Sequence, residues 1–130
     1  MRYRIGSAVA VVAVVLQLAV VSAHHGFGIV FDASSRSILT GTLTRVDLRN
    51  PHIALSLDAK TDRGQVEVWK IEGAAPAFFA RNGISKTAFQ EAIDQRVTVE
   101  VHRAKDGSLL GSLRKITFPN GTSVTSDPNY

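Results

Sequence analysis

The side chains best suited to chemistry at neutral pH are four histidines: the pair His24-His25, then His52 and His102. The pair directly follows a stretch of small residues that ends at Ala23, so a cleavage there would make His24 the first residue of the mature chain. A terminal histidine can chelate one metal ion through its α-amine and its ring nitrogen together. Copper(II) favours such nitrogen-rich, tetragonal sites. The spacing therefore predicts a copper site at His24, with His25 and His52 as further ligands.

Residues 1–23 carry the three parts of a secretory signal peptide. Arg2 and Arg4 form the positive start, an apolar run extends from Ala8 to Val21, and small residues lead up to Ala23. A retained membrane anchor is the alternative, but a spanning helix needs about 20 apolar residues and this run is shorter. We expect cleavage after Ala23, a periplasmic or secreted location, and no stable membrane span after processing.

Each histidine also has a structural interpretation. The His24-His25 pair can be a disordered tail. His52 can simply fix the start of a strand by bonding a backbone carbonyl. Strand alternation places His102 on the same face as Glu100, opposite the valines of that segment, so we expect it off the core.

Three further residues are candidates for a ligand-binding face: Asn50, Trp69 and Glu72. Asn50 begins an Asn-Pro-His turn, a rigid position next to a predicted strand. Trp69 can be a platform for a ligand ring, although a lone strand tryptophan more often packs in a core. Glu72 lies near the end of the same segment and can line a groove.

Composition excludes several classes of function. The chain has no cysteine, which excludes disulfides, thiolate metal ligation and thiol catalysis. It has no Gly-x-Ser-x-Gly elbow, phosphate-cradling loop or matched acid–base pair, which favours a non-enzymatic role. Removing residues 1–23 takes two arginines from a chain with a net charge of +4, so little basic surface is left for nucleic acid.

The elements that must position these residues are mostly strands. Gly41 interrupts the first strand, as a bulge or tight barrel bend would, and Asn50-Pro51 ends the connection that follows it. The expected strands are 37–47, 52–59, 65–71, 96–103 and 109–118, with a helix at 76–82 and a second helical turn from Ser85 to Phe89.

This order, three strands, a short helix and two strands, is that of an OB-fold, a small five-stranded Greek-key barrel. A two-sheet sandwich is the alternative, because strand count alone does not separate the two. We expect residues 24–36 to form an N-terminal arm, held to the barrel by Phe27 and Phe31, and residues 37–125 to form the OB-like domain.

Several short motifs occur in a familiar order, among them His24-His25-Gly26-Phe27, Gly41-Thr42-Leu43-Thr44 and Asn50-Pro51-His52. The others are Phe31-Asp32, Trp69, Gly73, Pro76 and Gly83. In these residues the chain resembles a family of small secreted bacterial proteins known as a domain of unknown function. The resemblance runs from about His24 to Gly121. It implies an envelope location and a β-barrel-like domain, and it implies no activity.

The sequence thus favours a non-enzymatic periplasmic or secreted binding module with an OB-like fold. Its partner would be a small ligand, an oligosaccharide or an envelope protein. The alternative is a periplasmic copper-binding protein that uses His24 with His25 and His52. A third, weaker hypothesis is a copper-dependent oxidase in which His24 supplies half of a copper brace.

Overall fold

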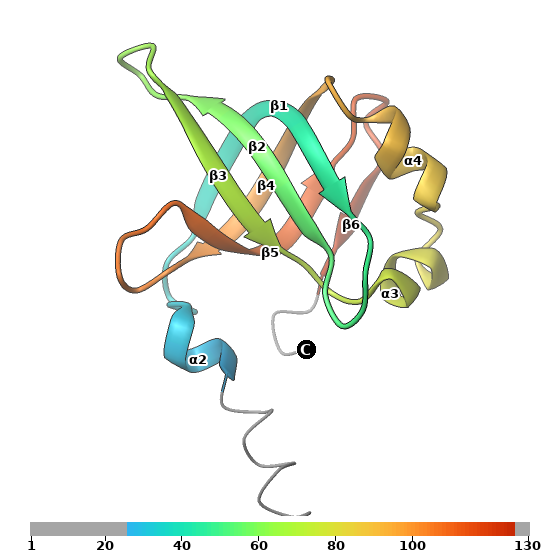
Figure 1. Cartoon of the computed structure of the whole chain (residues 1–130), viewed down its shortest axis with the longest axis horizontal. Helices are drawn as coiled ribbons and strands as arrows, with labels where there is room; N and C mark the ends of the chain where they lie inside the picture. Colours follow the sequence, from blue (N-terminus) through green and yellow to red (C-terminus); the bar gives the residue numbers. More distant parts are fainter. Residues whose placement is uncertain (1–25, 127–130) are drawn as a thin grey trace, which may run out of the picture. The chain divides into compact units, whose positions relative to one another are not determined.

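The computed structural model describes residues 26–126 (Figure 1). The chain divides after Val30 into two compact units, and the first contributes the short helix α2 to the described part. The elements are α2 (Gly26–Val30), β1 (Ser37–Asp47), β2 (Ala54–Lys60), β3 (Val66–Glu72), α3 (Pro76–Arg81), α4 (Lys86–Glu91), β4 (Arg96–Arg103), β5 (Leu110–Thr117) and β6 (Ser123–Thr125). The second unit therefore contains all the described strands.

Strands β1 to β5 close into a barrel. Strand β1 pairs antiparallel with β2 and with β4, β2 pairs with β3, and β4 pairs with β5. A short parallel pairing of β3 with β5, which aligns Lys70 with Leu110 and Glu72 with Ser112, closes the ring. The order around the barrel is β1-β2-β3-β5-β4, which confirms the predicted OB-like barrel and excludes the sandwich. The short strand β6, which the sequence did not predict, extends the sheet beyond β5.

Gly41 lies where β1 changes from one side of the barrel to the other. It aligns with Ala59 of β2 and with Val97 of β4. A Cβ atom at this position would lie 2.3 Å from the main-chain oxygen of Asp58 and 2.9 Å from the Cα of Ala59. The close approach of β2 therefore requires a residue without a side chain, which is the tight bend that the sequence predicted.

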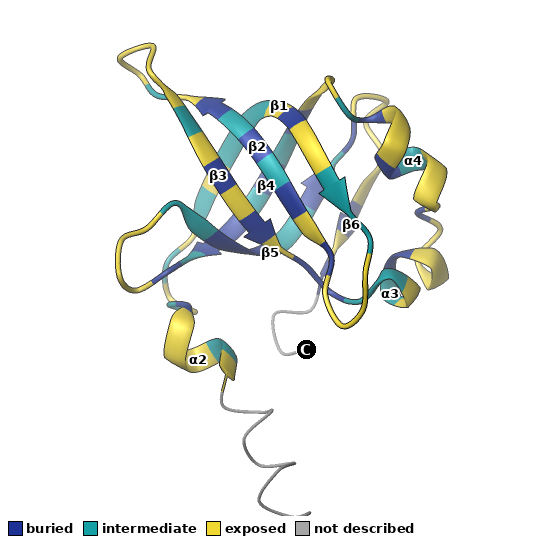
Figure 2. Cartoon of the chain, in the orientation of Figure 1, coloured by how far each residue is buried: buried dark blue, intermediate teal, exposed yellow. Residues whose placement is uncertain are grey.

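The core fills the barrel, and strand alternation selects its members (Figure 2). In β2, Leu55 and Leu57 are buried while Ala54 is exposed, as the alternation of a strand requires. Edge-to-face contacts run from Phe79 through Phe89 to Phe118, with successive ring centroids 5.2 Å apart, and tie α3 and α4 to the end of β5. Such aromatic pairs add stability beyond their buried area.

The two helices between β3 and β4 follow their sequence signals. Pro76 occupies the first turn of α3, and Gly83 after its end has a φ of +79°. The Ser85 hydroxyl accepts a hydrogen bond from the Ala88 amide at 3.0 Å and caps α4, the helical turn that was predicted from Ser85 to Phe89.

The predicted exposure of His102 is wrong. His102 stays on the face of β4 opposite Val101, but the segment that contains Ser35 covers it, so both Val101 and His102 are buried. The Nδ1 atom of His102 lies 2.8 Å from the carbonyl oxygen of Ser35. Because a carbonyl can only accept, Nδ1 carries the proton and donates it.

The segment after α2 is held against the end of β4. Phe31 is buried and forms a bridge with Ala104, and the Asp32 amide donates to the Arg103 carbonyl at 3.0 Å. The Arg103 amide in turn donates to the Ser35 hydroxyl at 3.0 Å. Phe31 therefore anchors part of the predicted 24–36 arm, whereas helix α2 was not predicted.

Candidate functional site

A shallow hollow of about 240 Å³ lies on the outer face of β2 and β3. It is found where β3 ends, β2 begins and β5 begins, because Ala54 aligns with Glu72 and Glu72 aligns with Ser112. The loop 48–53 leads into β2 and the loop 104–109 leads into β5, so both loops flank this end of the face. The hollow is lined by Arg45, Asp47, Ala54, Leu55, Ser56, Lys70, Ile71, Glu72 and Leu110.

Strand periodicity explains the polar lining of the hollow. Leu55 and Ile71 point into the core, so their neighbours Ser56, Lys70 and Glu72 point outward. Ser56 aligns with Lys70 across the β2–β3 pair, which places a hydroxyl beside an ammonium group. The neighbouring strand β1 adds one residue of each charge, so acidic and basic side chains both line the hollow.

One carboxylate of the hollow is held ionised. The Arg49 guanidinium forms a paired contact with Asp47, through Nε to Oδ1 at 2.7 Å and through Nη2 to Oδ2. This side-chain hydrogen bond lowers the pKa of Asp47 below its ordinary value of 3.8, and the charges of Arg49 and Arg45 lower it further. Asp47 is therefore a fixed negative charge at neutral pH and is unsuited to donate a proton.

The predicted ligand-face residues fall in different places. Glu72 lines the hollow, and Asn50 is exposed in the adjoining loop 48–53, next to a cis peptide bond to Pro51. Trp69 points the other way and is only 1% exposed. Trp69 is a core residue and is not part of the outer face.

The Trp69 ring has two polar partners, one at its N–H and one over its face. Its Nε1 donates to the Glu67 carboxylate at 3.1 Å, and the Arg103 guanidinium lies 4.8 Å from the ring centroid. This arrangement satisfies the indole N–H and adds a cation–π contact, so the packing interpretation explains the residue.

Sequence reasoning missed three charged lining residues: Arg45, Asp47 and Lys70. Alternation in β3 signals that Lys70 points outward. The two β1 residues follow a register shift between Leu43 and Arg45, and a simple period of two does not reveal such a shift.

The histidines do not come together as a group in the described part of the chain. His52 is exposed in the loop 48–53, off the core as predicted, while His102 is buried at the end of β4. His24 and His25 lie outside the described residues. Within residues 26–126, no cluster of three or more histidine and acidic side chains is arranged to hold a metal ion.

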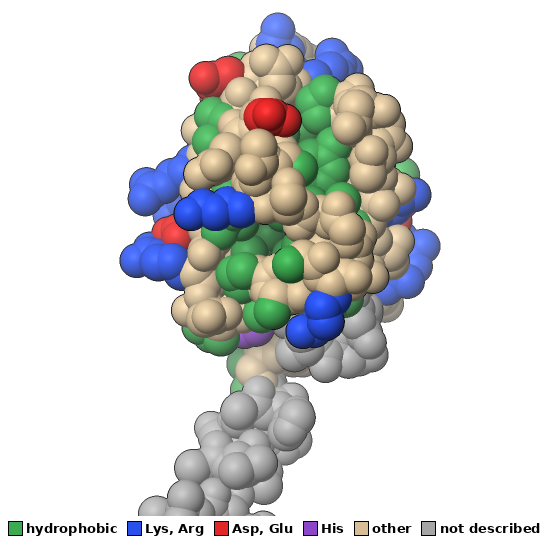
Figure 3. Space-filling view, turned by 90° about the vertical axis from the view of Figure 1, so that its right-hand side faces the viewer, with side chains coloured by type: hydrophobic (Ala, Val, Ile, Leu, Met, Phe, Trp, Pro, Cys, Tyr) green, Lys and Arg blue, Asp and Glu red, His purple; other side chains and the backbone are tan. Residues whose placement is uncertain are grey.

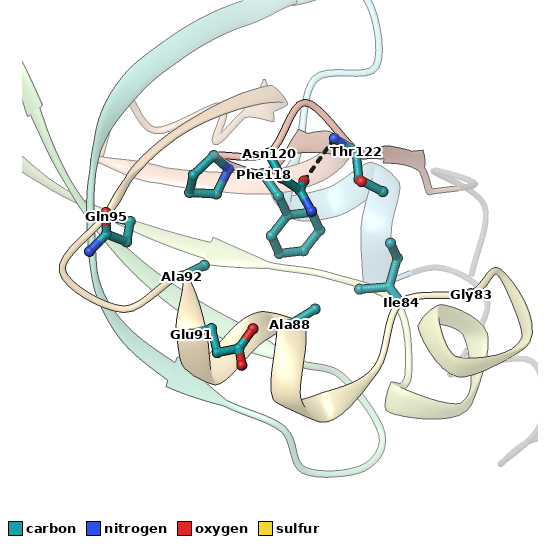
Figure 4. A pocket seen from close by; sticks show the side chains of 10 residues that line it. Gly83, Ile84, Ala88, Glu91, Ala92, Gln95, Phe118, Asn120 and Thr122 are labelled. Carbon is teal, nitrogen blue, oxygen red and sulfur yellow. Dashed lines mark hydrogen bonds between the residues drawn. The ribbon is translucent and has the colours of Figure 1, made fainter.

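Two more hollows lie on the side of the molecule that carries α3 and α4. Figure 3 shows this face, where hydrophobic side chains gather between scattered lysines and arginines. One, of about 260 Å³, has a mainly apolar lining that includes Leu48, Phe79 and Phe89. The other, of about 390 Å³, lies between α4 and the turn that joins β5 to β6 (Figure 4). Both of these hollows are therefore separate from the β2–β3 face.

The fold and the polar hollow define this protein as a small OB-like β-barrel. No helix among residues 26–126 is long and apolar enough to cross a membrane. A family model matches residues 10–114, so the chain belongs to the DUF6152 family, a family of unknown function. This membership confirms the resemblance seen in the sequence. Comparisons with curated proteins and with solved structures gave no match.

Proposed function

We propose that this protein is a non-enzymatic binding module whose ligand surface is the β2–β3 face. The observation that carries the proposal is the polar hollow between the loops 48–53 and 104–109. OB-folds bind their ligands on the face of strands two and three, between the loops that correspond to these two. The argument from fold is an analogy, and the lining residues supply the chemistry.

The lining favours a polar ligand that carries both charges. Arg45 and Lys70 offer positive groups, while Asp47 and Glu72 offer negative ones, within one hollow. A peptide segment of an envelope protein, or a short zwitterionic peptide, presents an ammonium, a carboxylate and amide groups to such a lining. With Trp69 buried, the lining has no aromatic side chain on which a sugar could stack, which favours a peptide over an oligosaccharide.

The state of Asp47 supports a binding role over an acid–base role. General acid–base catalysis needs a group whose pKa lies near the working pH. The pKa of Asp47 is moved away from neutrality by its contact with Arg49. Paired with Arg49, this carboxylate stays ionised and can accept further hydrogen bonds from a ligand, but it does not supply a proton.

The test is an amide NMR titration of the chain 24–130 with short zwitterionic peptides and, separately, with neutral oligosaccharides. We expect the peptides to cause saturable shifts at the amides of β2 and β3 around Ser56 and Lys70. Shifts caused by the oligosaccharides and not by the peptides would contradict the ligand class. Shifts confined to other parts of the barrel would contradict the site.

We also propose that the module works outside the cytosol, in the periplasm or secreted. Support comes from the positive start, apolar run and small residues of positions 1–23. Mass spectrometry of the protein isolated from its natural host should give a chain that begins at His24. A chain that still begins at Met1 would contradict this proposal.

A copper site is a second candidate function. The observation that favours it is His52, which is exposed in the loop 48–53, and the sequence expectation adds His24 and His25 as the other ligands. Correctly processed protein should bind copper(II) with a visible absorption band, and a form acetylated at the His24 α-amine should bind it far more weakly, because an acetylated amine cannot ligate the metal. Equal binding by both forms would contradict the terminal chelate.

A further inference from the structure

The hollow between α4 and the β5–β6 turn has a preformed apolar floor. Ile84, Ala92 and Phe118 are each at most 5% exposed, and Ala88 lies beside them. The ring of Phe118 is fixed by its edge-to-face contact with Phe89, with centroids 5.2 Å apart. The small side chains of α4 leave space in front of this ring, as Figure 4 shows.

The rim of the same hollow is polar. Glu91 of α4 and Gln95 lie on one side, and Asn120 and Thr122 of the turn lie on the other. The Asn120 Oδ1 accepts a hydrogen bond from the Thr122 amide at 2.9 Å, so the turn is held in shape by its own side chain. Among the described residues that line this hollow, Glu91 is the one with a charged side chain.

The size and lining together resemble those of a small-molecule site. Such sites usually have volumes of about 300–1,000 Å³, mostly apolar walls and a few polar groups. The hollow of about 390 Å³ has an apolar floor on one side and a single carboxylate on its rim. It shares no lining residue with the β2–β3 hollow, so it is independent of the proposed function.

We infer that this second hollow binds a small organic cation, an ammonium group attached to a flat apolar body of about one ring. The apolar body would cover Phe118, Ala88 and Ala92, and the ammonium would meet the Glu91 carboxylate. Charge complementarity selects this class, because no basic side chain among the described lining residues competes with the cation.

The probe is 2-phenylethylammonium, with 2-phenylethanol as its uncharged analogue of nearly the same shape. Amide NMR titration of the chain 24–130 should give saturable shifts at Ala88, Ala92 and Thr122, with millimolar affinity for the amine and weaker affinity for the alcohol. The absence of saturable shifts at these amides, or equal affinity for amine and alcohol, would overturn the inference.

Two variants separate the charge from the shape. Glu91→Gln should weaken amine binding about two- to fivefold, the range expected for an exposed ion pair, and leave the alcohol unaffected. Glu100→Gln, a matched change on β4 outside the hollow, should leave both ligands unaffected. Ala88→Leu fills the space and should abolish both. Unchanged amine binding by Glu91→Gln would exclude the carboxylate, and unchanged binding by a folded Ala88→Leu form would exclude the site.

Discussion

Replacing Gly41 by alanine should destabilise the barrel strongly. The added Cβ would lie 2.3 Å from the Asp58 oxygen, 2.8 Å from the Asp58 carbonyl carbon and 2.9 Å from the Ala59 Cα. All three are main-chain atoms, so no side-chain rotation relieves the contact, and β1 and β2 must separate by about 1 Å. Overpacking typically costs about 1–3 kcal/mol, and each ladder hydrogen bond that the separation weakens adds about 1 kcal/mol. We therefore expect a loss of about 3 kcal/mol or more.

Urea denaturation followed by circular dichroism measures this effect. Gly41→Ala should lower the midpoint while leaving the slope nearly unchanged, which indicates a change in stability alone. Gly28→Ala is the control, because a Cβ there meets no atom within 4 Å and the residue lies in a helix. A loss below about 1 kcal/mol for Gly41→Ala would refute the steric argument, since that is the low end of ordinary overpacking.

Three further predictions concern single interactions. His102→Ala should lower the free energy of unfolding by about 1–3 kcal/mol in urea denaturation, because it leaves the partly buried Ser35 carbonyl without this donor; a wild-type value would contradict the assigned hydrogen bond. Ser85→Ala should cost about 1 kcal/mol and speed amide exchange at the start of α4, whereas unchanged exchange would exclude the cap. Arg49→Gln should raise the pKa of Asp47 toward 3.8 in a carbon-detected NMR titration. Since the pKa of Asp47 is lowered in the folded protein, the contact with Arg49 stabilises the fold above pH 3.8, and this stabilisation is lost as the pH falls through the folded-state pKa. Equal pKa values of Asp47 in the variant and the natural protein would contradict the contact.

Much of the fold was predictable because local signals and tertiary structure agree. The alternation of Ile53, Leu55 and Leu57 selects one face for the core, and all three are buried. Gly41 marks the bend of the first strand, and Pro76 and Ser85 mark the starts of the two helices. Each of these signals depends on a few neighbouring residues, and the observed structure agrees with each of them.

The features that were missed depend on contacts between segments that are distant in the sequence. The exposure of His102 was predicted wrongly because the segment that contains Ser35 covers that face of β4. Strand β6 has only three residues, Ser123–Thr125, too few for a recognisable period. Its pairing with β5 defines it as a strand.

The candidate site was predicted only in part for the same reason. Glu72 was named because it lies near Trp69 in the sequence, yet the two side chains point to opposite sides of β3. The hollow exists because closure brings Arg45 of β1 and Leu110 of β5 to the same end of the β2–β3 pair. No local pattern contains that information.

The central claim is that the charged lining of the β2–β3 hollow binds the ligand. Isothermal titration calorimetry of the best-binding zwitterionic peptide tests it, with the double variant Lys70→Gln/Glu72→Gln compared with Glu100→Gln/Lys115→Gln. The second pair consists of register partners on β4 and β5, outside the hollow, so it removes the same charges elsewhere. We predict that the first variant loses most of its affinity and that the second binds like the natural protein. Equal affinity for both variants would contradict the proposed site.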